Sequence, residues 1–303
     1  MRILLTGKNG QVGWELRRTL APLGEVVALG SAECNLADPQ AIRQTLAEVR
    51  PDVIINPAAY TAVDKAEAEA DLAMAVNGTA PGILAEEAKR LNAALIHFST
   101  DYVFDGAQAA PYTEEDAPNP QSVYGRSKLA GEDAIRASGA KHLILRTSWV
   151  YGVHGGNFMK TMLRLGRERD ELRVVADQFG APTWARDLAT ATATLLQKWQ
   201  AMQFDPALSG VYHLTAAGRT SWHEYAVEIF KLAHQWDAVL AQHSPNVQPI
   251  STAEFPLPAK RPANSVLSNE KIRQTFGVQL PDWHDSLRDC LEDLLKPASA
   301  TPD

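Results

Sequence analysis

Residues 2–16 read RILLTGKNGQVGWEL, and this stretch decides the fold. Its apolar beginning, residues 2–6, stops at a glycine, which is typical of a short buried strand. Val12, Leu16 and Leu20 then recur at helical spacing and predict a helix over residues 12–20. A strand, a glycine-rich turn and a helix therefore open the chain.

The turn has the spacing G-x-x-G-x-x-G, formed by Gly7, Gly10 and Gly13. Glycines at such a turn let the backbone approach a pyrophosphate closely, while the helix N-terminus directs its free N–H groups at the anion. Glycines also occur in βα turns for packing alone. At the first βα turn of an alternating chain, dinucleotide binding is the interpretation that we favour.

The first half of the chain continues this alternation. Apolar runs predict further strands at residues 25–29, 53–56, 94–98 and 142–146. Amphipathic stretches predict helices at about residues 39–49, 71–91 and 122–137, and a last helix at about 282–295. Short apolar strands that alternate with helices pair in parallel through right-handed crossovers. We therefore expect an α/β fold with a doubly wound, Rossmann-like parallel sheet.

The rhythm changes after about residue 147, where longer connections contain Gly, Pro and Trp. Loops at the carboxyl side of a parallel sheet usually build a substrate pocket. We expect a dinucleotide-binding domain over residues 1–146, with returning segments near 172–200, and a mainly substrate-binding, smaller domain over 147–303. Residues 245–262 are rich in proline and are expected to be irregular.

The charge balance excludes some partners. The 303 residues include 29 Lys and Arg against 36 Asp and Glu, which gives a net charge of −7. We expect neither nucleic acid nor membrane as a partner, because both require clustered positive charge. Cys34 and Cys290 are too few for a disulfide framework or a four-cysteine zinc site. The N-terminal run is too short for a signal peptide, so the cytoplasm is the expected location.

The end of the second predicted strand bears on the choice of dinucleotide. It reads Leu29-Gly30-Ser31 and contains no carboxylate, whereas an acid commonly binds the ribose 2′-hydroxyl of NAD at this point. Without that acid a 2′-phosphate meets less repulsion, and Lys8 could pair with one. These residues favour NADP(H) and leave NAD(H) open. The alternative for Lys8 is a solvated loop lysine.

Tyr124 and Lys128 are candidates for acid catalysis. They are four residues apart in a predicted helix, so one helix face presents both. A phenol has a pKa of about 10, and a nearby ammonium brings it toward the working range. Thr100 directly follows the fourth predicted strand, where its hydroxyl can orient a substrate oxygen. His97 lies within that strand and is interpreted as a core histidine rather than a base.

Longer strings narrow the assignment. They are GKNGQVGWEL, AAYTAVDKAE, STDYVFDG, VYGRSKLAGE, RTSWVYG, NFMKTMLRL, DQFGAPT and RPANSVLS. As a set, over residues 5–268, they resemble the extended short-chain dehydrogenase/reductases and, among these, the dTDP-4-dehydrorhamnose reductase family. The resemblance implies reduction of the C4 ketone of a dTDP-bound 4-keto-6-deoxyhexose by NADPH or NADH, a step toward the dTDP-L-rhamnose used for surface polysaccharide.

The resemblance also implies roles for single residues. Tyr124 becomes the proton donor, Lys128 binds the nicotinamide ribose and lowers the Tyr124 pKa, and Thr100 orients the substrate. The implied substrate contacts are Thr100, Asp101, Trp149, Lys260 and Arg261. The implied cofactor contacts, beyond the glycines, are Gln11, Val12, Asn35, Leu36, Ala59, Tyr60 and Thr61.

Some members of the resembled family bind Mg²⁺ at a dimer contact built from carboxylates. Glu15 fits one ligand position of that contact. Arg186 departs from the pattern, because a carboxylate is expected there and Asp187 is only adjacent. Mg²⁺ binding at Glu15 and a homodimer therefore remain open expectations.

Two other functions compete. A sugar-nucleotide epimerase or 4,6-dehydratase of the same fold is the first, but dehydration needs an acid/base pair that those relatives place as Asp-Glu after the threonine. Here Asp101 is followed by Tyr102, so reduction is favoured. The second is a non-catalytic regulatory subunit. Loss of the Thr, Tyr or Lys would favour it, but Thr100, Tyr124 and Lys128 are all present.

Overall fold

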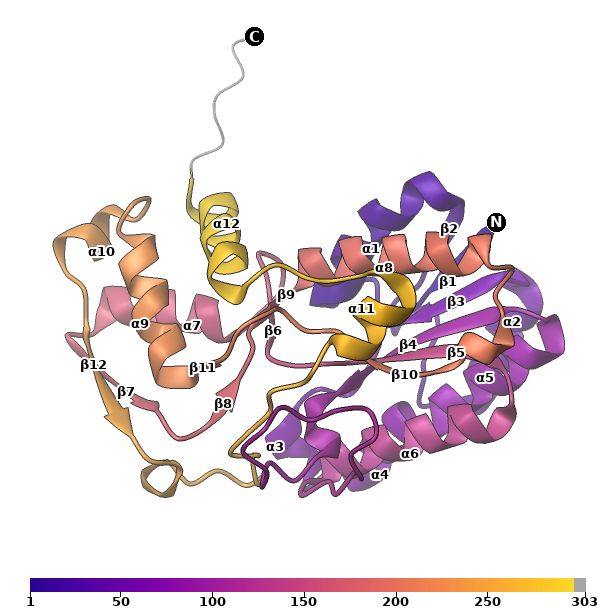
Figure 1. Ribbon diagram of the computed structural model, residues 1–303, viewed down its shortest axis with the longest axis horizontal. Helices are drawn as coiled ribbons and strands as arrows, with labels where there is room; N and C mark the ends of the chain where they lie inside the picture. Colours follow the sequence, from indigo (N-terminus) through magenta and orange to yellow (C-terminus); the bar gives the residue numbers. More distant parts are fainter. Residues whose placement is uncertain (297–303) are drawn as a thin grey trace, which may run out of the picture.

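The computed structural model describes residues 1–296 and contains two lobes that lie side by side (Figure 1). The larger lobe is built on the strands β1 (Arg2–Leu5), β2 (Glu25–Ala28), β3 (Val53–Asn56), β4 (Ala94–Thr100), β5 (Lys141–Thr147) and β10 (Gly210–His213). They form one sheet in the order β10-β5-β4-β3-β1-β2, and every neighbouring pair is parallel. The predicted doubly wound parallel sheet is confirmed.

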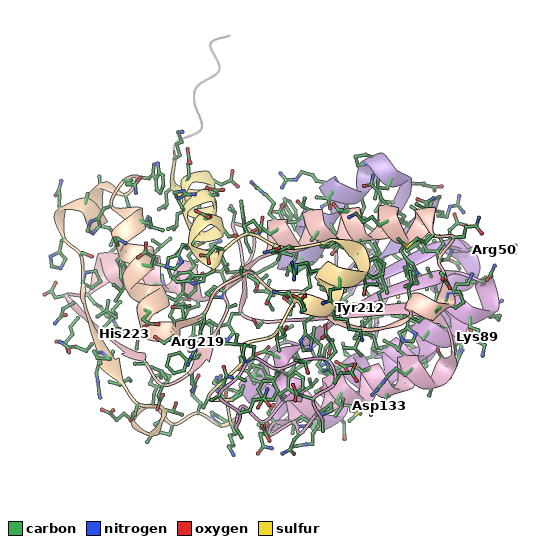
Figure 2. All side chains as sticks on the ribbon, viewed as in Figure 1. Arg50, Lys89, Asp133, Tyr212, Arg219 and His223 are labelled. Carbon is green, nitrogen blue, oxygen red and sulfur yellow. The ribbon has the colours of Figure 1, made fainter. Side chains whose placement is uncertain are left out.

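The helices of the larger lobe cover both faces of this sheet. They are α1 (Gln11–Leu20), α2 (Pro39–Val49), α3 (Val63–Ala66), α4 (Ala70–Met74), α5 (Ala80–Leu91), α6 (Val123–Ser138), α8 (Ala185–Ala201) and α11 (Glu270–Phe276). Helices α1 and α8 lie on one face, and α2, α5 and α6 on the other (Figure 1). Exposed charged side chains such as Asp133 on α6 stand at the outer surface (Figure 2).

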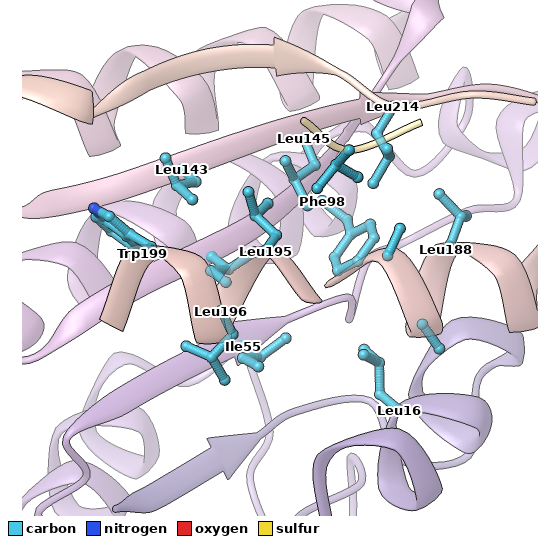
Figure 3. Close-up of a cluster of buried hydrophobic side chains, with 14 of the residues drawn as sticks. Leu16, Ile55, Phe98, Leu143, Leu145, Leu188, Leu195, Leu196, Trp199 and Leu214 are labelled. Atoms are coloured by element: carbon cyan, nitrogen blue, oxygen red, sulfur yellow. The ribbon is translucent and has the colours of Figure 1, made fainter. Parts of the chain in front are cut away.

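The main core fills the space between the sheet and the α1/α8 layer (Figure 3). Leu16 of α1, Leu188 and Leu195 of α8 and Ile55 of β3 are fully buried there. Phe98 of β4 belongs to the same core and is nearly buried. Because α8 and β10 belong to this lobe, the chain returns to it after residue 147.

The smaller lobe is built from short elements. They are β6 (Val150–Tyr151), β7 (Glu171–Val175), β8 (Phe179–Gly180), β9 (Thr183–Trp184), β11 (Thr220–Ser221), β12 (Asn246–Ile250), α7 (Phe158–Glu168), α9 (Trp222–Ala233), α10 (Ala238–Gln242) and α12 (Trp283–Leu295). A separate core holds it together, with Met159, Leu163, Ile229 and Leu287 among its buried members.

The expectation that residues 245–262 are irregular is wrong for their first part. Asn246–Ile250 forms β12, which pairs in parallel with β7. Pro249 is compatible with this strand, because a proline is tolerated in a strand of a sheet edge. Among residues 1–296, no helix has both the length and the apolar character that crossing a membrane requires.

Candidate active site

A cleft of about 630 Å³ lies where the strands of the large sheet end. Its walls come from the segments that follow β1, β2 and β3, from the end of β4, from α6 and from the loop after β6. In the sheet β1 lies between β2 and β3, so the strand order reverses direction at β1. This switch point is where open α/β sheets bind ligands, outside the carboxyl ends of the strands.

The glycine loop is shaped for a close backbone approach. Gly7 has a φ of +62°, and a Cβ there would lie 2.9 Å from the Cα of Ala58. A Cβ on Gly13 would lie 2.1 Å from the carbonyl oxygen of Gly7. Helix α1 begins at Gln11, and no side chain of residues 1–296 caps its N-terminus. The loop and helix end therefore offer backbone N–H groups to an anion, which fits the pyrophosphate of a dinucleotide.

Most of the predicted cofactor residues line this cleft. They are Gly7, Gly10, Gln11, Val12, Gly13, Asn35, Leu36, Ala59, Thr61, Tyr124 and Lys128. Tyr60 does not line it, because its phenol donates to Glu69 and its backbone N–H donates to Asn77 Oδ1 at 2.8 Å. Asn77 lies in the π-helical turn Ala75–Thr79, which interrupts the helix predicted over 71–91. The amide of Asn77 thereby holds the loop after β3.

Several residues that line the cleft were missed by the sequence analysis. They are Thr6, Asn9, Gly30, Ser31, Cys34, Pro57, Ala58, Val76, Phe98, Ser99, Thr147, Val150, Gly155 and Gly156. Many of them stand at the ends of predicted strands, which is a usable signal. The loop with Gly155 and Gly156 gave no such signal. Side-chain bonds bring it to the glycine loop, since Gln11 donates to the Val150 carbonyl at 3.2 Å and accepts from Asn157 at 2.9 Å.

A carboxylate does stand at the end of β2, contrary to the sequence argument. Glu33 accepts the Gly30 N–H at 2.9 Å and forms an ion pair with Lys8. A Cβ on Gly30 would lie 3.2 Å from Glu33 Oε2, so this carboxylate reaches the place that a side chain at position 30 would take. Lys8 and the Gly30 N–H hold the pKa of Glu33 below its usual range.

Thr100, Asp101 and Tyr124 form the polar group at the end of β4. The Thr100 hydroxyl donates to Asp101 Oδ1 at 3.0 Å. Burial raises the pKa of Tyr124 to about 12, and the Thr100 hydroxyl opposes this rise. Burial likewise raises the pKa of Asp101 to about 6. Asp101 Oδ2 has no hydrogen-bond partner among residues 1–296. The phenol is thus protonated at neutral pH and lies beside a hydroxyl that can share a ligand oxygen.

Lys128 is buried one helical turn beyond Tyr124. Helix α6 begins with Ser122 as its cap, which accepts the Gly125 N–H at 3.1 Å and fixes the turn that carries Tyr124. The Lys128 ammonium donates to the carbonyl oxygen of Phe98 at 2.6 Å. Burial lowers the pKa of Lys128 to about 8, while the Glu132 carboxylate opposes this change.

Glu132 continues the same helix face and meets an arginine on β5. Arg146 donates to its two carboxylate oxygens at 2.9 and 2.6 Å, and the Ser99 hydroxyl donates to it at 2.5 Å. The two charged side chains are 0% and 3% exposed. This pair is buried, and its carboxylate lies one helical turn beyond Lys128 on α6.

Trp149 occupies a backbone conformation that L residues rarely adopt, with a φ of +48°. Its ring stacks on Trp222 with centroids 3.5 Å apart, and Gly180 provides the space beside it. Such an outlier persists only where its surroundings hold it, often at a ligand site.

Lys260 and Arg261 approach the larger lobe from the smaller lobe. Arg261 binds Asp64 through two N–H groups at 3.0 and 2.7 Å, and Lys260 donates to Gln121 at 3.2 Å. The predicted basic pair is therefore already engaged by residues of the larger lobe. A diphosphate would have to compete with Asp64 for the Arg261 guanidinium.

Glu15 has arginines rather than carboxylates as neighbours. It forms an ion pair with Arg18 and lies 3.6 Å from Arg186, whose guanidinium also binds Asp293 at 2.6 Å. Within residues 1–296 no group of three or more His, Cys, Asp or Glu could hold a metal ion. Within this chain the Arg186 guanidinium thus lies between the carboxylates of Glu15 and Asp293.

Comparisons with known proteins agree over nearly the whole chain. Residues 1–296 match the family model described as RmlD substrate binding domain. The chain is 49% identical to a dTDP-4-dehydrorhamnose reductase of Burkholderia thailandensis over 302 residues, which cover 97% of this chain and 99% of that protein.

Two solved structures are similar in fold and sequence. One is a dTDP-4-dehydrorhamnose reductase of Clostridium acetobutylicum, with a TM-score of 0.89, 41% identity and coverage of 97% of this chain and 99% of that one. The other, from Bacillus anthracis, is in complex with NADP. It has a TM-score of 0.87, 37% identity and coverage of 96% and 99%.

Proposed function

The chain belongs to the RmlD substrate binding domain family, that of the dTDP-4-dehydrorhamnose reductases, and from this premise we propose that it reduces dTDP-4-dehydro-L-rhamnose to dTDP-L-rhamnose. The observation that carries the proposal is that Tyr124 and Lys128 line the same cleft as the glycine loop, while the Thr100 hydroxyl is hydrogen-bonded to the Tyr124 phenol. Tyr102 follows Asp101 where a dehydratase needs a second acid.

The residues divide the chemistry as follows. A dinucleotide, NADPH or NADH, supplies the hydride when bound. Thr100 orients the ketone oxygen, and the Tyr124 phenol donates its proton to that oxygen as the alkoxide forms. The Lys128 ammonium lowers the cost of the resulting phenolate. The loop of Gly7, Gly10 and Gly13 binds the pyrophosphate.

The division of labour between the lobes is part of the proposal. Residues 1–146, with α8 and β10, form the dinucleotide side, and most of the remainder forms the sugar-nucleotide side. Asp101 Oδ2, which is buried and unpartnered among residues 1–296, is suited to accept from a sugar hydroxyl. The stacked Trp149 supplies a flat apolar surface, and Arg261 can turn from Asp64 to a diphosphate.

We expect the purified protein to oxidise one reduced dinucleotide per molecule of dTDP-L-rhamnose formed. Turnover with dTDP-4-dehydro-L-rhamnose should exceed that with UDP- and GDP-ketosugars, because the smaller lobe would contact the base. The measurement is loss of dinucleotide absorbance together with product analysis. Product without net oxidation would indicate an epimerase or dehydratase, and no oxidation with any ketosugar would indicate a binding subunit.

We expect the Lys8–Glu33 pair to admit both NADPH and NADH. Glu33 can accept from a ribose 2′-hydroxyl, whereas a 2′-phosphate would draw Lys8 away from it. Glu33→Gln should shift the ratio of kcat/KM for NADPH over NADH upward by about tenfold, and Lys8→Gln should shift it downward, as for loss of one charge-assisted bond. Competition by 2′,5′-ADP and 5′-ADP reports the same preference without turnover. Equal ratios in all three proteins would contradict the assignment.

A further inference from the structure

The Lys128 ammonium contacts a buried histidine, His97, which has no role in the proposed chemistry. His97 Nε2 lies 3.2 Å from Lys128 Nζ, and His97 Nδ1 lies 3.0 Å from the side-chain amide of Asn56. Asn56 Oδ1 in turn accepts from the Thr6 hydroxyl at 2.6 Å. All four side chains are at most 2% exposed. Such a buried polar chain is costly unless every member is paired.

The charge of Lys128 determines which atom donates and which accepts in each hydrogen bond of this row of side chains. An ammonium only donates, so His97 must be neutral and must accept through Nε2. Burial and the Lys128 charge both hold the pKa of His97 well below its ordinary value. The proton of the neutral ring then sits on Nδ1, and the Asn56 amide can present its oxygen to it, because its two ends are interchangeable in shape.

If Lys128 is neutral, every hydrogen bond in this row of side chains points in the opposite direction. The Thr6 hydroxyl donates to Asn56 Oδ1, the Asn56 amide donates to His97 Nδ1, and His97 Nε2–H donates to the lysine amine. The row of side chains can therefore form hydrogen bonds to Lys128 in its charged or its neutral form. The side chain at position 56 determines which direction of hydrogen bonding has the lower free energy.

We propose that His97 is a positioning residue for Lys128: its Nε2 accepts from the ammonium, favours the charged form and leaves the third N–H directed at the cleft. The Phe98 carbonyl takes the second N–H. The inference rests on the proposed function, since it concerns the lysine that serves Tyr124.

Other charged groups surround Lys128 and must be considered in its titration. Glu132 on α6 favours the ammonium, and Arg146 on β5 binds that carboxylate. Tyr124 lies one turn earlier on α6, and Asp101 lies at the end of β4. The variants below leave all four in place. The His97 variants therefore report the histidine contact itself, whereas Asn56→Asp also adds a carboxylate near Lys128.

His97→Leu removes the acceptor. The alkaline decline of kcat/KM, set by loss of the Lys128 proton, should begin about one pH unit lower, because a bond to a charged group is worth roughly one to two pKa units. His97→Gln retains an acceptor oxygen and should restore most of the shift. Asn56→Asp offers acceptors to both Thr6 and the His97 Nδ1–H, fixes Nε2 as an acceptor and should move the decline upward.

The pH dependence of the NADPH dissociation constant, measured by fluorescence without sugar, gives the same test without turnover. His142→Leu is the matched control, because it removes another buried histidine of the sheet, which bonds the Ala140 carbonyl, and should leave both profiles unchanged. Unaltered profiles in folded His97→Leu and Asn56→Asp, or equal shifts in the control, would overturn the inference. If no ketosugar is reduced but the binding profiles shift as stated, the proposed function fails and the role of His97 stands.

Discussion

Tyr124→Phe should lower kcat for the reduction by about 10²–10⁴-fold, the usual contribution of a positioned general acid. The phenylalanine keeps the ring and its edge contact with Tyr102, whose centroid lies 5.6 Å away. Only the proton donor is lost, so the dissociation constant for NADPH should change little. Steady-state kinetics with dTDP-4-dehydro-L-rhamnose and fluorescence titration with NADPH separate the two effects.

Tyr212→Phe is the matched control for this variant. Tyr212 on β10, labelled in Figure 2, donates its phenol to the Leu208 carbonyl at 2.8 Å. It is not among the residues that line the cleft. Its variant should retain wild-type turnover. Turnover of Tyr124→Phe within a few-fold of wild type would remove Tyr124 from the role of acid and shift attention to Asp101, whose raised pKa also permits proton donation.

The protonation of Tyr124 sets a further constraint on that result. In the ligand-free protein burial raises its pKa to about 12, so the donor form prevails throughout the neutral range. The Lys128 ammonium, with a pKa lowered to about 8, titrates first as the pH rises. The alkaline decline of wild-type activity should therefore follow Lys128 rather than Tyr124.

The sheet could be predicted from the sequence because its strands are short apolar runs buried on both faces. Arg2–Leu5, Val53–Asn56 and Ala94–Thr100 are of this kind. The strand β10 was not predicted, because it follows a long connection and pairs with residues 67 positions earlier in the chain, with Gly210 opposite Leu143. The strand β12 was not predicted because its segment is rich in proline, which argues against a strand. Its strand conformation depends on tertiary pairing with β7, which the local sequence does not show.

The site was predictable where one residue type at one spacing carries the chemistry. Gly7, Gly10 and Gly13 together with Tyr124 and Lys128 do this, and all five line the cleft. The carboxylate of Glu33 was not predictable by position, since a turn rather than a strand end brings it back to Gly30. The contact of His97 with Lys128 joins β4 to α6, and no local pattern in the sequence specifies it.

Arg146→Met should destabilise the protein by about 3–5 kcal/mol, because it leaves the Glu132 carboxylate buried without its counter-charge. Methionine fills much of the volume and retains contact with Phe104, over whose ring the guanidinium lies at 5.0 Å. The loss should appear as a lower urea midpoint with an unchanged dependence on urea.

Arg136→Met provides the comparison within the same helix region. Arg136 forms an ion pair with Asp133 three residues earlier, but these side chains are 49% and 58% exposed. Solvent screens that pair, so its loss should cost no more than about 0.5 kcal/mol. The double variant Arg146→Met with Glu132→Leu should recover most of the stability, since it removes both charges together. Equal costs for Arg146→Met and Arg136→Met would mean that the Arg146–Glu132 pair is hydrated in solution and does not lie in a low-dielectric interior.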